Sequence, residues 1–242
     1  QRQMCIRDRH DIMLMEQTYP GEEDARKHFD FLLKAFKDDR YIKIDGSPLF
    51  YIFKPEDVPF TYLTWFRQWA KEAGFKGLYL VANAWGQNSV EHYRDMGYQA
   101  VIENNMLDLL QMKYAQMSKL KEILYRSYRR IKQGLLGMSR GAMDYGEFVH
   151  NVVTDDCKNR FIIPEIFPNW DHSPRSGRAA TAIFYNEDPN FFYEMACDAL
   201  NAIKDKPEEG QIIILKSWNE WGEGNYLSLI HISEPTRHAQ IS

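Results

Sequence analysis

The stretch QIIILKSWNEWGEGNY (residues 211–226) joins a short apolar run to a cluster of polar and aromatic side chains. A continuous apolar run of this length is typical of a strand that is buried on both faces of a parallel sheet. The residues after it include the carboxylates Glu220 and Glu223, with Trp218 and Trp221 beside them in the sequence. Functional groups gather where the strands of parallel α/β proteins end, so this stretch predicts both a strand and a site.

The same alternation of strand and helix precedes this stretch. Apolar runs predict strands at 47–54, 76–83, 98–104, 160–167 and 211–218. Helical spacing of apolar residues predicts helices at 22–41, 62–75, 89–97 and 189–206. Strands that alternate with helices indicate parallel βαβ units, so we predict an α/β fold whose sheet is covered on both faces.

Residues 104–137 interrupt this alternation with a long helical pattern that carries seven Lys or Arg and two acidic residues. One interpretation is a solvated excursion that packs one apolar face on the body of the protein. The other is a basic amphipathic surface that makes peripheral contact with an anionic membrane or a lipid-phosphate carrier. The sequence leaves both open.

The composition excludes several classes of function. The chain has 242 residues, of which 44% are hydrophobic and 26% charged, and its net charge of −4 disfavours nucleic acid as a partner. Cys5, Cys157 and Cys197 form no disulfide pattern. No apolar stretch approaches the roughly 18 residues that span a bilayer. We expect no metal or cofactor, because no Gly-rich phosphate loop and no Asp-x-Asp motif is present, which also disfavours an ordinary sugar-nucleotide transferase.

The two ends of the chain have the character of foreign sequence. Met4–Arg9 can be written in codons as ATG TGT ATA AGA GAC AGx, whose reverse complement encodes Leu-Ser-Leu-Ile-His-Ile, the residues at 227–232. This DNA sequence is similar to the transposase end sequence that is used to prepare sequencing libraries. We therefore predict that residues 1–9 and 228–242 are translated adaptor sequence. Residues 10–227 would then be an internal fragment of a longer protein, as metagenomic sequencing produces.

Polar side chains end each predicted strand: Lys54, Asn83 with Trp85, Glu103 with Asn104, Glu165, and residues 217–223. Amides and carboxylates bond sugar hydroxyls, and indole faces cover the apolar side of a sugar ring, so these residue types predict a carbohydrate site. Neighbouring indoles raise the pKa of a carboxyl by desolvating it, so Glu220 and Glu223 suit the acid and base roles of glycosidic chemistry. A solvated acidic loop would explain the two carboxylates but not the tryptophans.

Four motifs make the chain resemble the WbsX-type glycosyltransferases, which are similar to glycoside hydrolase family 99, the endo-α-mannosidases. They are EQTY (16–19), HFDFLLKAFKDDRYIKIDGSPLF (28–50), FPNWDHSPR (167–175) and SWNEWGEGNY (217–226). The resemblance implies a partial (β/α)8 TIM-type barrel whose N-terminal strands and tryptophan-rich motif lie upstream of this chain. His172 stands where the family usually has Asn.

The resemblance also implies roles for residues. Glu220 would deprotonate the sugar 2-hydroxyl, which attacks the anomeric carbon to give a 1,2-anhydro sugar, and Glu223 would act as general acid and then base. Asp171, Arg175 and Trp170 would contact the substrate. With the strand ends and the last motif, the candidate substrate-binding residues are Asn83, Glu103, Glu165, Trp170, Asp171, Arg175, Trp218, Asn219 and Trp221.

We therefore predict a glycosyltransferase or retaining glycoside hydrolase of bacterial polysaccharide metabolism, of the O-antigen or lipopolysaccharide type. Its partner would be an oligosaccharide or lipid-linked glycan, and its location cytoplasmic, although the missing N-terminus leaves a signal peptide open. The alternatives are a non-catalytic carbohydrate-binding protein on a barrel scaffold, or an inactive truncated fragment. We expect the 242-residue chain alone to be inactive.

Overall fold

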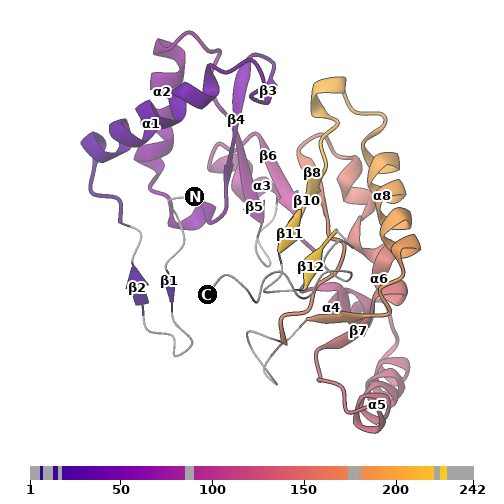
Figure 1. The fold of residues 1–242 in the computed structure, drawn as a ribbon. Coiled ribbons are helices and arrows are strands. Elements are labelled where there is room, and N and C mark those ends of the chain that lie inside the picture. Colours follow the sequence, from indigo (N-terminus) through magenta and orange to yellow (C-terminus); the bar gives the residue numbers. More distant parts are fainter. Residues whose placement is uncertain are drawn as a thin grey trace, which may run out of the picture. The chain divides into compact units, whose positions relative to one another are not determined.

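The computed structural model describes residues 6–7, 13–15, 18–84, 90–173, 180, 182–220 and 224–227 (Figure 1). The chain divides into two compact units, each with a core of its own. The first unit comprises residues 1–104, 156–164 and 203–212, and the second comprises residues 105–155, 165–202 and 213–242.

A six-stranded sheet has the order β10-β8-β6-β5-β4-β3. Its strands are β3 (Lys43–Ile44), β4 (Ser47–Ile52), β5 (Tyr79–Ala84), β6 (Ala100–Glu103), β8 (Ile162–Ile166) and β10 (Ile214–Leu215). Strands β4, β5, β6, β8 and β10 are parallel to their neighbours, and only β3 pairs antiparallel, with β4. The α/β fold and the five predicted strands are therefore confirmed, with shorter bounds than the apolar runs suggested.

The order of the parallel strands follows the order of the chain without a reversal. A doubly wound sheet reverses its strand order near the middle, whereas neighbouring strands of a (β/α)8 barrel follow one another along the chain. Strand β8 takes part in both units: residues 162–164 pair with β6, and residues 165–166 pair with β10.

Aromatic side chains form the core of the first unit, where α1 (Glu22–Phe36) and α2 (Phe60–Glu72) pack together and α3 (Val90–Asp95) follows β5. Phe29 and Phe36, seven residues apart, lie on one face of α1 and are fully buried. The Phe29 ring contacts Phe66 at 5.5 Å and Trp69 at 5.6 Å between centroids. The helical spacing in 22–41 thus correctly marked the buried face of α1.

The second unit contains α4 (Leu109–Ala115), α5 (Lys119–Leu135), α6 (Tyr145–Val152) and most of α8 (Pro189–Ile203). The long helical pattern predicted within 104–137 forms two helices. Helix α4 ends at Ala115, and Ser118 caps the start of α5 by accepting a hydrogen bond from the Lys121 amide at 3.5 Å. Sequence analysis also assigned no helix to α6, whose eight residues are too few for a clear period.

Two small sheets belong to the second unit. Strands β7 (Ala142–Asp144) and β9 (Ile183–Tyr185) are parallel, and β11 (Asn219–Glu220) and β12 (Asn225–Tyr226) form an antiparallel hairpin. The described residues also form the short helices η1 (Pro55–Asp57), η2 (Asp155–Lys158) and η4 (Glu208–Gly210).

Near the N-terminus, β1 (Ile6–Arg7) pairs antiparallel with β2 (Met13–Met15). The other residues of the two ends predicted to be adaptor lie outside the described residues. Their foreign origin stays a prediction.

Two glycines of the second unit provide a matched test of its packing. A Cβ at Gly146 in α6 would collide with the Phe191 ring of α8, whereas a Cβ at Gly134 in α5 would meet nothing within 4 Å. We expect Gly146→Ala to lower the free energy of unfolding by about 1–3 kcal/mol. Gly134→Ala should raise it by about 0.5–1 kcal/mol, since alanine favours the helix. Urea titrations measure both, and unchanged stability of Gly146→Ala would contradict the packing described.

Candidate functional site

The first unit presents two of the predicted site residues at strand ends. Asn83 in β5 is 1% exposed, and its Oδ1 has no hydrogen-bond partner within the part of the chain that the structure describes. Glu103, the last residue of β6, accepts a hydrogen bond from the Cys157 thiol at 2.8 Å. Buried polar atoms are rarely left unpaired, so a partner that completes the bonding of the Asn83 Oδ1 is expected.

The second unit presents Glu165 in β8, which is 7% exposed. Burial raises the pKa of this carboxyl, and the Lys216 ammonium, 3.9 Å from Glu165 Oε1, partly opposes the shift. The Lys216 amide also donates to the Ile166 carbonyl at 2.8 Å. The end of β10 is therefore fixed beside the end of β8.

Lys216 links this carboxyl to the FPNWDHSPR motif. Its ammonium lies 4.7 Å from the centroid of the Trp170 ring, a cation–π contact. The Trp170 ring stacks on His172 with 6.0 Å between centroids, and the Trp170 carbonyl accepts a hydrogen bond from the Phe184 amide at 2.8 Å. Sequence analysis gave Lys216 no role; its place directly after a buried apolar run was the available indication.

The last motif forms the β11–β12 hairpin, in which Glu220 pairs with Asn225. The backbone turns at Ser217, with φ 65°, and at Gly224, with φ 59°. A Cβ at Gly224 would lie 2.9 Å from the Asp171 Cβ and 3.1 Å from the Asp171 amide nitrogen. Glycine is required here by both the φ angle and the close approach, and the hairpin thus packs against Asp171.

Asn225 is the second residue that sequence analysis did not single out. It is 0% exposed, and neither its Oδ1 nor its Nδ2 has a hydrogen-bond partner among the described residues. An unsatisfied buried amide costs about 1–3 kcal/mol. Such a group is expected where a ligand or an ordered water completes the bonding.

The expectation that Trp218 would desolvate Glu220 is not met. Trp218 is 76% exposed, and Glu220 is exposed as well. The reason is the hairpin itself, because an isolated two-stranded ribbon leaves side chains on its outer face open to solvent. The buried carboxyl near this hairpin is Glu165.

Four predicted residues lie outside the described residues: Glu223, Trp221, Arg175 and Trp85, together with the side chain of Asn219. Their roles stay predictions. Within the described ranges, no group of three or more His, Cys, Asp or Glu side chains could hold a metal ion, and no helix is long and apolar enough to cross a membrane.

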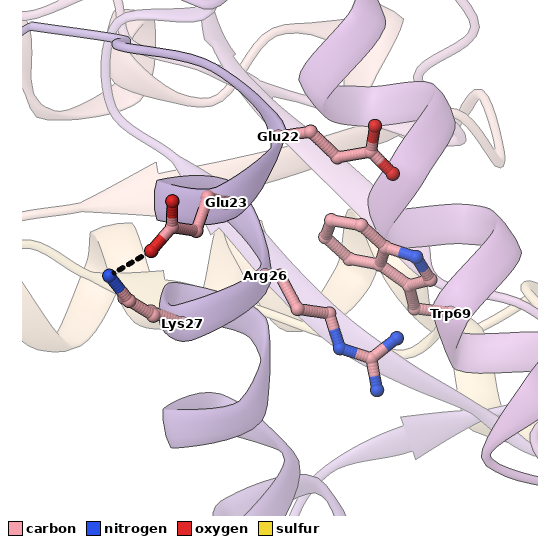
Figure 2. A pocket seen from close by; sticks show the side chains of 5 residues that line it. All are labelled: Glu22, Glu23, Arg26, Lys27 and Trp69. Carbon is pink, nitrogen blue, oxygen red and sulfur yellow. Dashed lines mark hydrogen bonds and ion pairs between the residues drawn. The ribbon is translucent and has the colours of Figure 1, made fainter.

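A surface hollow between α1 and α2 lies in the first unit (Figure 2). It is lined by Glu22, Glu23, Arg26, Lys27 and Trp69. Figure 2 shows the Lys27 ammonium paired with Glu23 at 2.6 Å and Arg26 beside Trp69, 5.1 Å from its ring centroid. These cations are already occupied and none of the lining residues is a predicted site residue, so the hollow is not the candidate site.

The buried Glu165 makes stability depend on pH. Its folded pKa lies above the ordinary 4.5, so protonated Glu165 stabilises the fold below that value and the stabilisation is lost as the pH rises through the folded pKa. We expect Glu165→Gln to raise Tm relative to the parent chain more at pH 8 than at pH 4. Glu187→Gln, a change at an exposed carboxylate, is the control. An equal effect of Glu165→Gln at both pH values would contradict this assignment.

Comparisons with known proteins agree with the motifs. Two curated relatives, each an uncharacterized protein WxcX from a strain of Xanthomonas campestris pv. campestris, are 22% identical over 223 residues. The match covers 90% of this chain, and the chain spans 29% of the length of these relatives.

Among solved structures, one described as a glycoside hydrolase-like protein has a TM-score of 0.52 and 16% identity, and the match covers 84% of this chain and 52% of that chain. This similarity bears on the fold alone. The GH99 endo-alpha-mannosidase from Bacteroides thetaiotaomicron has a TM-score of 0.44 and 13% identity, over 86% of this chain and 53% of that chain. The family model described as Glycosyltransferase WbsX matches residues 3–238. The resemblance inferred from the motifs is thereby confirmed: the chain belongs to the WbsX glycosyltransferase family.

Proposed function

We propose that this chain is part of a carbohydrate-active enzyme that acts on glycosidic bonds in bacterial polysaccharide metabolism of the O-antigen or lipopolysaccharide type. Family membership carries the proposal. The packing of the Glu220 hairpin against Asp171 supports it, because two of the motifs then meet in one place within the second unit. The substrate would be an oligosaccharide or a lipid-linked glycan.

The scaffold of this enzyme, we propose, is a (β/α)8 barrel of which residues 10–227 form the later part. The order of the parallel strands, which follows the chain without reversal, supports a barrel. The match to 52% of the length of the glycoside hydrolase-like neighbour supports a larger whole. The first strands of the barrel would then come from the rest of the protein.

The proposed reaction uses two carboxylates in turn. Glu220 removes the proton of the sugar 2-hydroxyl while O2 attacks the anomeric carbon, and Glu223 gives a proton to the departing glycosidic oxygen. A 1,2-anhydro sugar results. Glu223 then takes a proton from water or from an acceptor hydroxyl that opens this ring, and Glu220 returns its proton to O2, so the configuration is retained. Water makes the enzyme a hydrolase, and a sugar acceptor makes it a transferase.

The exposure of Glu220 suits a group that must reach a substrate hydroxyl, and the Gly224–Asp171 contact places Asp171 beside the same hairpin. Asp171, Trp170 and Arg175 would bind the sugar. In the second unit, Glu165, Trp218, Asn219 and Trp221 would make the other proposed contacts. Asn83 and Glu103, in the first unit, stay predicted substrate contacts. Lys216 would be a positioning residue: its ammonium would hold the Trp170 ring in place and partly balance the charge of the Glu165 carboxylate. The cytoplasmic location stays a prediction.

Substitution of the two carboxylates tests the reaction. In a polypeptide of the relatives' full length, Glu220→Gln and Glu223→Gln should each lower kcat by about 10²–10⁴ and leave glycan binding largely intact. Each change keeps the shape but removes a base or a titratable acid. Glu187→Gln is the matched control at an exposed position. Binding that is retained without any turnover in the parent protein would favour a non-catalytic carbohydrate-binding protein.

A substrate analogue tests the role of Glu220 separately. Because its proposed partner is the 2-hydroxyl, a 2-deoxy glycoside should be nearly inert even with both carboxylates present. Comparison of initial rates with the parent glycoside measures this. Rapid cleavage of the 2-deoxy substrate would exclude the anhydro-sugar route. Only the broader proposal, that Glu220 and Glu223 act as a catalytic carboxylate pair, would then remain. The 242-residue chain alone should show no activity, since the proposed barrel is incomplete.

A further inference from the structure

Helix α5 (Lys119–Leu135) presents its apolar side chains to solvent. Six of them are between 58% and 82% exposed: Leu120, Ile123, Leu124, Tyr128, Ile131 and Leu135. Their spacing of three and four residues places them in one stripe along the helix. A monomeric soluble protein rarely exposes a continuous apolar surface of this kind without a use for it.

The polar face of α5, in contrast, packs on the second unit. Gln133 is buried and donates to the Ala142 carbonyl of β7 at 3.1 Å, and Arg129 donates to the same carbonyl at 2.8 Å. The Tyr125 hydroxyl donates to Glu147 of α6 at 2.5 Å. The helix is therefore attached to the unit through hydrogen bonds from its polar face, while its apolar side chains remain exposed.

The flanks of the apolar stripe are basic. Within α5, six Lys or Arg accompany a single acidic residue, Glu122. With 3.6 residues per turn, Lys121 lies on one flank of the stripe and Lys119 and Arg130 lie on the other. Lys121, Lys119 and Arg130 are exposed. An apolar stripe bordered by lysine and arginine is the pattern of a helix that lies in a membrane interface.

The geometry points to α5 as a docking surface for an anionic lipid bilayer, with the apolar stripe entering the headgroup boundary and the flanking cations bonding lipid phosphates. A second copy of the chain is the less favourable occupant, because face-to-face packing of two α5 helices would bring their basic flanks together. The inference does not depend on the glycosidic chemistry. It selects the membrane interpretation of residues 104–137.

Vesicle flotation of the 242-residue chain tests the proposal. We expect the chain to float with vesicles of phosphatidylcholine and phosphatidylglycerol and not with phosphatidylcholine alone. Raising the salt from about 0.1 M to about 1 M, which shortens the Debye length from about 10 Å to about 3 Å, should weaken the binding. Association that does not depend on anionic lipid, or no association, would overturn the proposal.

Three variants separate the apolar from the electrostatic contribution of α5 to vesicle binding. Leu124→Glu with Ile131→Glu should abolish flotation, and Lys121→Gln with Arg130→Gln should weaken it about 25-fold, roughly five-fold per charge. Leu200→Glu changes an equally exposed leucine on α8 and should bind as the parent chain does. All five positions are exposed, so folding should be preserved, and circular dichroism checks this. Parent-like binding of the Leu124/Ile131 variant would exclude α5 as the contact.

Two other occupants of the stripe would give different results. A dimer in size-exclusion chromatography that dissociates on Leu124→Glu with Ile131→Glu would assign the stripe to a second copy. Vesicle binding that is present in this chain but absent from a polypeptide of the relatives' full length would show that another part of the protein covers the stripe. Either result would overturn the bilayer proposal.

Discussion

Strand β8 is the element on which the rest of the described structure depends. All five of its residues are buried, and it pairs with β6 through residues 162–164 and with β10 through residues 165–166. The Lys206 ammonium donates to the Ile162 carbonyl at 2.5 Å, which adds a side-chain contact at the start of the strand. Apart from Glu165, the side chains of this buried strand are apolar, as is typical of a parallel strand that is covered on both faces. The register with β10 then fixes where the glutamate-bearing hairpin begins.

Three buried polar groups, two in the second unit and one in the first, are not arranged for greatest stability. Glu165 is buried although burial raises its pKa, and the Asn83 and Asn225 amides leave polar atoms without partners among the described residues. Each of these costs free energy that an apolar side chain of similar size would not cost. Natural proteins tolerate such costs mainly at functional sites. This pattern supports functional roles for these residues independently of the motifs, because it rests on burial and bonding rather than on similarity.

Helix α5 buries its polar side and exposes its apolar side, the reverse of the usual orientation of an amphipathic helix. An amphipathic helix normally buries its apolar side, and sequence pattern alone predicts that orientation. In the second unit the polar side is the buried one, because Gln133, Arg129 and Tyr125 find carbonyl and carboxylate acceptors on β7 and α6. If the proposed glycan-processing activity acts on lipid-linked glycans, a docking helix would also keep the protein near that proposed substrate at membrane surfaces. The two proposals are therefore compatible, although neither requires the other.

The sequence by itself determined the alternation of strands and helices, the buried face of α1, and the family, since apolar periodicity and local motifs are properties of neighbouring residues. It did not determine that α4 ends at Ala115 before α5 begins, that α6 is a helix, or that Glu220 and Trp218 are exposed. Only the tertiary structure placed Lys216 between Glu165 and Trp170, and Gly224 against Asp171. These pairs are far apart in the chain, and contacts of that kind follow from strand register and chain path, which no local pattern encodes.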